Sequence, residues 1–197
     1  MSITEKSRKV EELFKSLEVE ISHLKKETGV HCIENCIYCC TTPKIMATSL
    51  EFYPLAYHLY KTGQAELVLE KIHNSEKTAS CPLLNSISID GSRIGCTQYE
   101  NRGMICRLFT YNYSTDKHGF RKISACKAMK LAQPDEIRKT NEILKEKSIG
   151  PRASGYYSQL QTIDFIEGQN LYPIREAITT AIENVLTYYH YKGSEIE

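Results

Sequence analysis

Cysteine is the residue type in this sequence that most clearly points to chemistry. The chain holds eight cysteines, and four of them lie within nine residues, at positions 32, 36, 39 and 40. Thiolates are the ligands that zinc and iron–sulfur clusters use in proteins. Crowded thiolates repel one another unless a cation neutralises them. The segment with Cys32, Cys36, Cys39 and Cys40 therefore predicts a metal centre.

The other four cysteines, Cys81, Cys96, Cys106 and Cys126, stand alone in turn-rich sequence. On a helix, the four clustered thiols would share an arc of about 100°. Thiols on one narrow face cannot surround an ion tetrahedrally, so we expect at least two of Cys81, Cys96 and Cys106 to complete the centre. Cys126 is the eighth candidate ligand. Eight thiols suffice for two tetrahedral sites, one four-ligand cluster or a larger multinuclear cluster.

Disulfides and inert buried thiols are the competing interpretations of these cysteines. The first twenty residues are charged throughout and lack the apolar segment of a signal peptide. No stretch approaches the ~18 apolar residues of a membrane span. We therefore expect a cytoplasmic protein, in which thiols stay reduced. Inert cysteines, which behave as small hydrophobic residues, do not account for four within nine residues.

Composition and charge exclude several classes of partner. The 197 residues fit a single domain, with 41% hydrophobic and 25% charged residues and a net charge of +1. Such a balance lacks the basic excess of a nucleic-acid-binding protein. We expect a metal ion or cluster as partner, with neither nucleic acid nor membrane, and a protein substrate or partner stays open.

Helices are predicted on both sides of the cysteine region. Apolar residues at helical spacing run from Val10 to Leu24, with Gly29 as a stop. Thr48 and Glu51 form a capping-box pattern before a helix over residues 52–60, and another helix is predicted over 64–77. Prolines 134 and 173 suit the first turns of two C-terminal helices, the first ending near residue 148 and the last at Gly193.

Between residues 81 and 126 short apolar runs alternate with turn residues. Asp90-Gly91 predicts a hairpin, and segments 107–115 and 120–126 predict a second ribbon around residues 117–119. We therefore expect a mostly helical α+β fold, with small β-hairpins around a cysteine-bound metal centre. Its single domain would comprise an N-terminal helix (1–29), a cysteine-cluster core (30–130) and a C-terminal helical region (131–197).

The cysteine region resembles the CxxCxxCC family, a zinc- or iron-chelating domain. The resemblance rests on CIENCIYCC, on Glu51 in the following helix, on CPLL from Cys81 and on GCTQYENRGMICRLF. The last stretch is similar to the family block C-x2-Y-x2-R-x3-C-R-x-F, represented by Cys96, Tyr99, Arg102, Cys106, Arg107 and Phe109. The resemblance covers roughly half of the chain and implies metal chelation by the cysteines.

Two positions depart from the family pattern. The first cysteine gap holds three residues instead of two, and Gly103 stands where the family usually has proline. The three-residue gap is similar to that of the flagellin lysine N-methylases. This second resemblance is confined to the cysteine region and implies a metal-dependent methylase as an alternative.

Arg107 is the candidate cofactor-binding residue outside the cysteines. It follows Cys106 directly, and a guanidinium can donate hydrogen bonds to the sulfurs of a negatively charged thiolate centre. The competing interpretation is a surface arginine on a strand. Arg102 receives the same interpretation with less weight.

CIENCIYC also resembles the C-x3-C-x2-C motif of radical S-adenosylmethionine enzymes. Those enzymes place the motif after the first strand of a β/α barrel. Here a long helical pattern precedes it and no regular βα alternation follows. Cys40 and the downstream cysteines are also unexplained by that interpretation, which we keep as the less favoured alternative.

The spacing of the isolated cysteines bears on the identity of the metal. Zinc sites commonly use two C-x-x-C pairs, and the four isolated cysteines form no second pair. Single cysteines that converge on a dense cluster suit a multinuclear centre better, so we favour an iron–sulfur cluster, with zinc as its rival. The sequence leaves open whether the centre is structural or catalytic, and therefore whether the protein is an enzyme.

Overall fold

The computed structural model describes residues 1–34, 36–42, 44–75, 80–85 and 94–192. These residues are mostly helical, as predicted, and their strands form two-stranded antiparallel pairs. The helices are α1 (Ile3–Thr28), the 3-10 helix η1 (Leu50–Phe52), α2 (Tyr53–Lys61), α3 (Ala65–Asn74), α4 (Met104–Leu108), α5 (Lys127–Ala132), α6 (Pro134–Glu146), α7 (Ala153–Ile163), α8 (Phe165–Gln169) and α9 (Ile174–Lys192). The pairs are β1 (Met46–Ala47) with β6 (Tyr172–Pro173), β2 (Leu84–Asn85) with β3 (Gly95–Cys96), and β4 (Tyr113–Thr115) with β5 (Arg121–Ile123).

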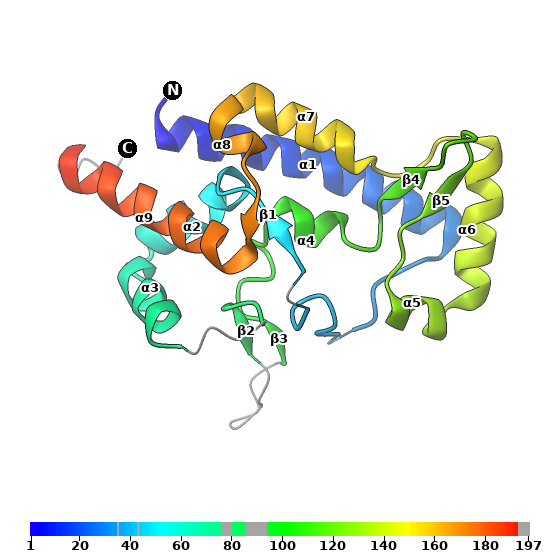
Figure 1. The fold of residues 1–197 in the computed structure, drawn as a ribbon, viewed down its shortest axis with the longest axis horizontal. Coiled ribbons are helices and arrows are strands. Elements are labelled where there is room, and N and C mark those ends of the chain that lie inside the picture. The colour runs from blue at the N-terminus through cyan, green and yellow to red at the C-terminus, as the bar shows by residue number, and fades with distance from the viewer. Residues whose placement is uncertain (35, 43, 76–79, 86–93, 193–197) are drawn as a thin grey trace.

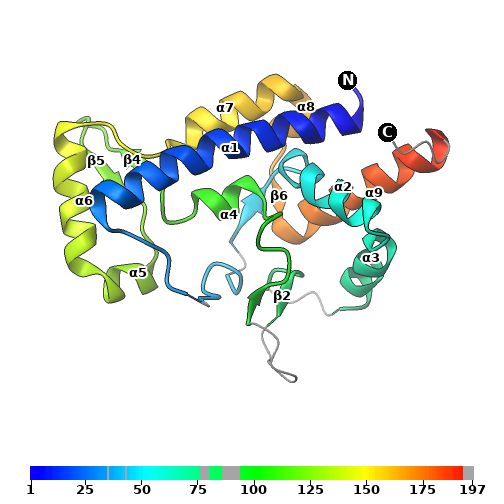
Figure 2. The ribbon, with the colours of Figure 1, turned by 180° about the vertical axis from the view of Figure 1, so that it is seen from behind.

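Helix α1 forms the long axis of the molecule. It crosses the upper part of the fold, with α7 and α8 beside it and α4 below it (Figures 1 and 2). Ser2 caps its first turn by accepting a hydrogen bond from the Glu5 backbone N–H. Gly29 ends it with φ 81°, a left-handed conformation that glycine adopts without strain. The predicted helix and its stop are confirmed.

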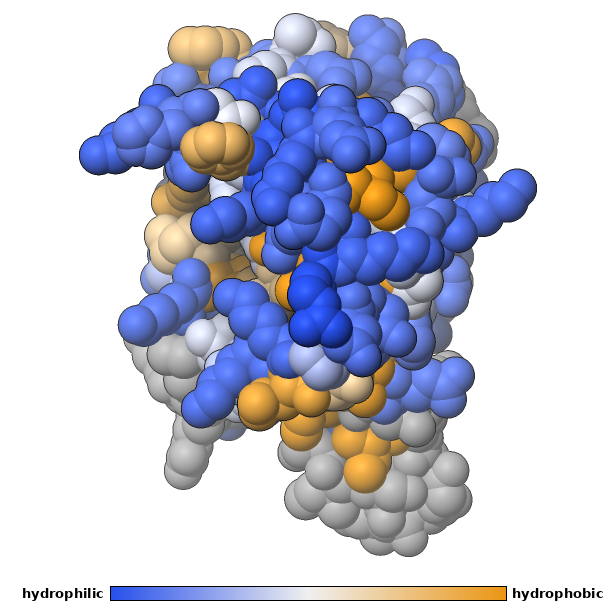
Figure 3. All heavy atoms as spheres, turned by 90° about the vertical axis from the view of Figure 1, so that its right-hand side faces the viewer, coloured by the Kyte–Doolittle hydropathy of each residue, from blue (hydrophilic) through white to orange (hydrophobic). Residues whose placement is uncertain are grey.

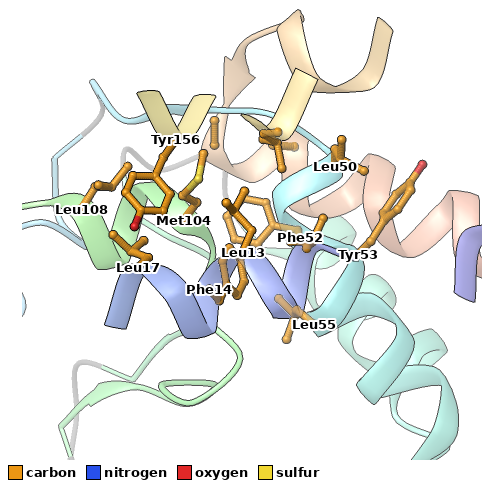
Figure 4. Packing of buried hydrophobic residues seen from close by; sticks show 14 of the residues in the cluster. Leu13, Phe14, Leu17, Leu50, Phe52, Tyr53, Leu55, Met104, Leu108 and Tyr156 are labelled. Carbon is orange, nitrogen blue, oxygen red and sulfur yellow. The ribbon is translucent and has the colours of Figure 1, made fainter. Parts of the chain in front are cut away.

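The hydrophobic core joins α1 to the elements that lead to the cysteines. Leu13, Phe14 and Leu17 of α1 point toward Phe52 of η1 and Met104 of α4 (Figure 4). All five side chains are buried. Burying such side chains contributes about 1.5–3 kcal/mol each. This packing holds α4, which carries Cys106, against the long helix.

Most of the other predicted helices are also confirmed. The predicted capping box of Thr48 and Glu51 precedes the 3-10 helix η1. The α-helix α2 starts one turn later, with Pro54 in its first turn. Helices α3, α6 and α9 lie where their patterns place them. The predicted end of the last helix, Gly193, lies outside the described residues.

Several elements differ from the sequence prediction or were missed by it. Arg107, Leu108 and Phe109 were expected at the start of a ribbon, but the first two belong to α4. Met104 and Leu108 are both buried in the core. Because residues four apart lie on the same face of a helix, a helical turn buries both side chains at once. Helices α5 and α8 are likewise too short to show a periodic pattern, and α7 has a mixed polar and apolar sequence.

The strand pairs connect distant parts of the chain. Leu84 in β2 lies opposite Cys96 in β3, while the predicted Asp90-Gly91 turn lies outside the described residues. The ribbon of β4 and β5 is confirmed at Tyr113–Thr115 and Arg121–Ile123. The pair of β1 and β6 was not predicted, because strands of two residues carry no periodic signal.

The surface over α5 and α6 is mostly hydrophilic, and hydrophobic residues gather at its lower edge (Figure 3). That edge lies at the height of the cysteine segment and of β2 and β3 in Figure 1. None of the described helices combines the length and the apolar character that crossing a bilayer requires.

Gly103 tests the packing that positions α4. A Cβ atom there would lie 2.6 Å and 2.7 Å from two ring carbons of Phe52 and 2.9 Å from Oε1 of Glu51. Because the Phe52 ring is held in the core, we expect Gly103→Ala to lower the free energy of unfolding by about 1–3 kcal/mol in urea titrations.

Gly155→Ala is the matched control for that change. Gly155 lies in α7, and a Cβ atom there meets nothing within 4 Å. Alanine favours helix over glycine by up to about 1 kcal/mol, so this variant should equal or exceed wild-type stability. Equal stability of the two variants would contradict the close packing of Gly103 on Phe52.

Candidate metal centre

The clustered cysteines lie in irregular turns between α1 and β1. The backbone N–H of Cys36 donates to the Ile33 carbonyl at 3.2 Å, and that of Cys40 donates to the Ile37 carbonyl at 2.9 Å. The segment is therefore a loop instead of one helical face. A loop can present its thiols in several directions, which helps them to meet thiols from other segments.

Seven of the eight cysteines line one cavity of about 580 Å³. They come from four separate stretches of the chain: the loop of residues 32–40, the residue Cys81 before β2, the strand β3 and the helix α4. The seven are Cys32, Cys36, Cys39, Cys40, Cys81, Cys96 and Cys106. The structure thus brings the loop to the same cavity as Cys81, Cys96 and Cys106, of which we expected at least two to join it.

The chemistry of this donor set fits a soft metal or cluster. Among the described residues no three such side chains already stand as ligands of one ion. One pair comes close, since the sulfurs of Cys39 and Cys40 lie 3.9 Å apart. Two thiolates on one tetrahedral ion, with metal–sulfur bonds of about 2.3 Å, lie about 3.8 Å apart. The distance between the two sulfurs therefore suits two ligands of one ion.

A backbone hydrogen bond holds the loop to the next cysteine. The N–H of Cys81 donates to the carbonyl of Cys40 at 2.7 Å. At the other end of the loop, the N–H of Cys32 donates to the Tyr111 hydroxyl at 2.8 Å. Both ends of the cysteine loop are thus fixed to segments that also line the cavity.

Burial disfavours the charged form of two cavity thiols, those of Cys81 and Cys106. It is the largest cause of the raised pKa of Cys81, about 11, and of the pKa of Cys106, which lies well above that of a free thiol. Neighbouring thiols add to the shift, and Cys39 acts on both residues. For Cys39 itself the hydrogen-bonding contact with Cys40 is the largest cause of a raised pKa. Without a cation these groups stay protonated, and a bound metal would displace their protons.

Cys126 stands apart from the cavity wall. It occupies the N-cap position of α5, where its sulfur accepts a hydrogen bond from the Met129 N–H at 3.4 Å. Its thiol is close enough to raise the pKa of Cys32, so Cys126 lies at the edge of the cysteine group. Its predicted role as a metal ligand stays a prediction, beside this observed role as a helix cap.

Comparison with known families agrees with this geometry. A family model described as "Putative zinc- or iron-chelating domain" matches residues 31–130, about half of the chain. The chain belongs to the CxxCxxCC family. No curated protein and no solved structure matches it significantly. As a CxxCxxCC protein it is a cysteine-cluster metal-binding protein, and the match extends past Cys106 to include Cys126.

The two arginines of the CxxCxxCC block share Glu18 as a partner but differ in their other contacts. Arg107 is buried and donates to Glu18 of α1 and to the carbonyls of Glu100 and Arg102. Arg102 lines the cavity and acts electrostatically on Cys96. A second cation, Arg175, acts on Cys81. Arg107 does not line the cavity but interacts electrostatically with Cys106, so its role beside the cofactor stays a prediction.

Glu51 is the one fully buried carboxylate beside the CxxCxxCC site among the described residues. Its Oε2 accepts from the Thr48 N–H and hydroxyl, both at 3.2 Å, while the Thr48 hydroxyl accepts from the Glu51 N–H at 3.3 Å. This confirms the predicted capping box. Its Oε1 also accepts from the Ile105 N–H at 2.9 Å, so the same carboxylate caps α4.

The environment of Glu51 combines opposing effects. Burial raises its pKa to about 7, while its hydrogen bonds from Ile105 and Thr48 oppose that rise. Tyr157 of α7 adds a weaker contact, its hydroxyl lying 3.4 Å from Oε2. Glu51 thereby joins η1, α4 and α7 directly behind Phe52 and Ile105, which line the cavity. The sequence identified the cap but gave no signal for the contact with α4, which is 54 residues away.

Removing this carboxylate should destabilise the fold. Glu51→Ala leaves the N–H groups of Thr48 and Ile105 buried without an acceptor, at about 1–3 kcal/mol each. We expect a loss of about 2–4 kcal/mol in the free energy of unfolding of metal-free protein, measured in urea. Glu51→Gln keeps one acceptor oxygen and should fall between alanine and wild type. Wild-type stability of Glu51→Ala would show that these hydrogen bonds do not hold α4.

Proposed function

We propose that the seven cavity cysteines bind a multinuclear iron–sulfur centre. The observation that carries this proposal is their convergence on one cavity of about 580 Å³ from four stretches of the chain. A single tetrahedral ion uses four ligands and would leave three of these thiols without a role. The cavity is much larger than a single ion needs. When bound, such a centre supplies electron transfer or an open iron site.

The chain's own residues would hold the centre from two sides. The loop of residues 32–40 would supply thiolates from below α4 in Figure 1, and β3 and α4 would supply Cys96 and Cys106. Phe52, Ile105 and Phe109 give part of the same cavity an apolar wall. Apolar walls limit the access of water to the centre and strengthen electrostatic interactions with it.

Zinc is the second candidate, and the spacing of Cys39 and Cys40 favours it. Their 3.9 Å separation suits two thiolates on one ion. In a cubane cluster each iron usually takes a single thiolate, so adjacent cysteines would have to separate onto different irons or leave one free. A zinc site would combine this pair with two of Cys81, Cys96 and Cys106.

The two enzyme alternatives receive unequal support. In the described part of the chain all strand pairs are antiparallel, and the C-x3-C-x2-C motif follows the long helix α1. Neither feature supports the barrel of radical S-adenosylmethionine enzymes. The resemblance to lysine N-methylases stays a prediction. A cavity of this size lies in the range of small-molecule sites, which favours a centre that is more than structural.

Elemental analysis separates iron from zinc. Protein expressed with ample iron and purified without oxygen should be brown and contain iron and acid-labile sulfide in comparable amounts, because bridging sulfide accompanies iron in clusters. Colourless protein with stoichiometric zinc would support the zinc candidate instead. Protein free of both metals, with its thiols oxidised to disulfides as isolated, would overturn metal binding altogether.

Substitution of single cysteines tests the ligand set. Cys106→Ser should lower metal content and melting temperature together, since metal-binding energy becomes folding energy. Cys126→Ser is the matched control, because serine is a preferred N-cap and preserves the start of α5. Because Cys126 does not line the cavity, we expect this variant to keep its metal, and loss of metal would instead support the sequence prediction that Cys126 is a ligand. Full metal content and an unchanged melting temperature in Cys106→Ser would contradict a shared centre.

A further inference from the structure

Two arginines and one glutamate form a charged group beside the cysteine cavity. Nη1 of Arg107 lies 2.6 Å from Oε1 of Glu18, and Nη2 of Arg102 lies 3.5 Å from the same oxygen. The three side chains together carry a formal charge of +1. Since only one carboxylate serves two guanidinium groups, the position of the surplus charge depends on which arginine that carboxylate neutralises.

Glu18 neutralises Arg107 far better than Arg102. Besides the 2.6 Å contact with Glu18, Nε of Arg107 donates to the Arg102 carbonyl at 3.1 Å and Nη2 donates to the Glu100 carbonyl at 2.6 Å. Its guanidinium also stacks on Phe14 of α1, 4.6 Å from the ring centroid. Every nitrogen of this guanidinium therefore has an acceptor, and the group is turned toward α1.

Arg102 is less closely paired with Glu18 and lines the cavity. Its guanidinium carbon lies 3.9 Å from the centroid of the Tyr99 ring, and its Nη1 donates to the Tyr99 carbonyl at 2.8 Å. Neither contact neutralises the charge. The side chain is only 15% exposed and lines the cavity together with Cys96. The acidic residues at the same cavity, Glu34 and Glu100, are exposed, so water screens them.

We propose that Arg102 is the positioning residue that supplies positive charge to the thiolate centre, and that Arg107 and Glu18 hold it in place. The inference rests on the proposed metal centre. A divalent ion with four thiolates carries a net charge of −2, and thiolate-bound iron–sulfur clusters are also anionic. A fixed guanidinium at the cavity wall stabilises such a centre. Arg107, the more buried arginine, also interacts electrostatically with Cys106, but its guanidinium is closely paired with Glu18.

Zinc affinity of reduced, metal-free protein measures this role directly. Binding of Zn²⁺ is followed without oxygen by competition with a chelating dye, for wild type, Arg102→Gln, Arg102→Lys and Arg107→Gln. Loss of a residue around the ligands commonly weakens metal binding 10–100-fold. We expect Arg102→Gln to bind Zn²⁺ about tenfold more weakly, with the urea stability of its metal-free form nearly unchanged. Arg102→Lys keeps the charge and should recover most of the affinity.

Arg107→Gln should lower the stability of the metal-free protein more than it lowers zinc affinity. It loses buried hydrogen bonds to Glu18 and to two carbonyls, so its metal-free form should be less stable, while its zinc affinity under folding conditions changes less than that of Arg102→Gln.

The outcomes separate this inference from the proposed function. Wild-type affinity in Arg102→Gln, or equal weakening in Arg102→Lys and Arg102→Gln, would overturn the role of the Arg102 charge while leaving the metal centre standing. Wild-type protein that binds no Zn²⁺ and purifies without iron would overturn the metal centre, and the role of Arg102 with it.

Discussion

The buried carboxylate of Glu51 connects the parts of the chain that surround the cysteine cavity. Its two oxygens accept hydrogen bonds from the Thr48 and Ile105 backbones, so one side chain fixes the start of η1 and the start of α4. An unpaired carboxylate in the core is costly, and the local backbone donors reduce that cost. Because α4 carries Cys106, the geometry of the cavity wall depends on this interaction.

Other contacts position the remaining cysteines around the same cavity. Side chains of α1 pack against Phe52 of η1 and Met104 of α4, the two elements that Glu51 joins (Figure 4). The backbone bond from Cys81 to Cys40 and the pairing of β2 with β3 bring the loop and the isolated cysteines to the same cavity. The protein scaffold thus gathers thiols whose mutual proximity is unfavourable as thiolates, and a metal centre removes that penalty.

Local sequence patterns predicted much of this fold. Features that depend on contacts between distant parts of the chain could not be predicted. The helical periodicity around Leu17, the stop at Gly29 and the capping box at Thr48 could be identified because they are signals between near neighbours in sequence. Helix α4 was missed because five residues carry little periodicity and its cap comes from Glu51. The cysteines that line the cavity were identifiable from residue type. The orientations of Arg102 and Arg107 were not, because both depend on Glu18, which lies in α1.

Thiol footprinting tests whether cysteines from four stretches of the chain share one metal centre. Protein purified without oxygen is alkylated before and after removal of its metal by a chelator, and the modified cysteines are identified by mass spectrometry. We predict that the seven cavity cysteines become reactive together when the metal is removed, while Cys126 reacts equally in both states. Metal-dependent protection confined to residues 32–40, with Cys81, Cys96 and Cys106 unaffected, would contradict it.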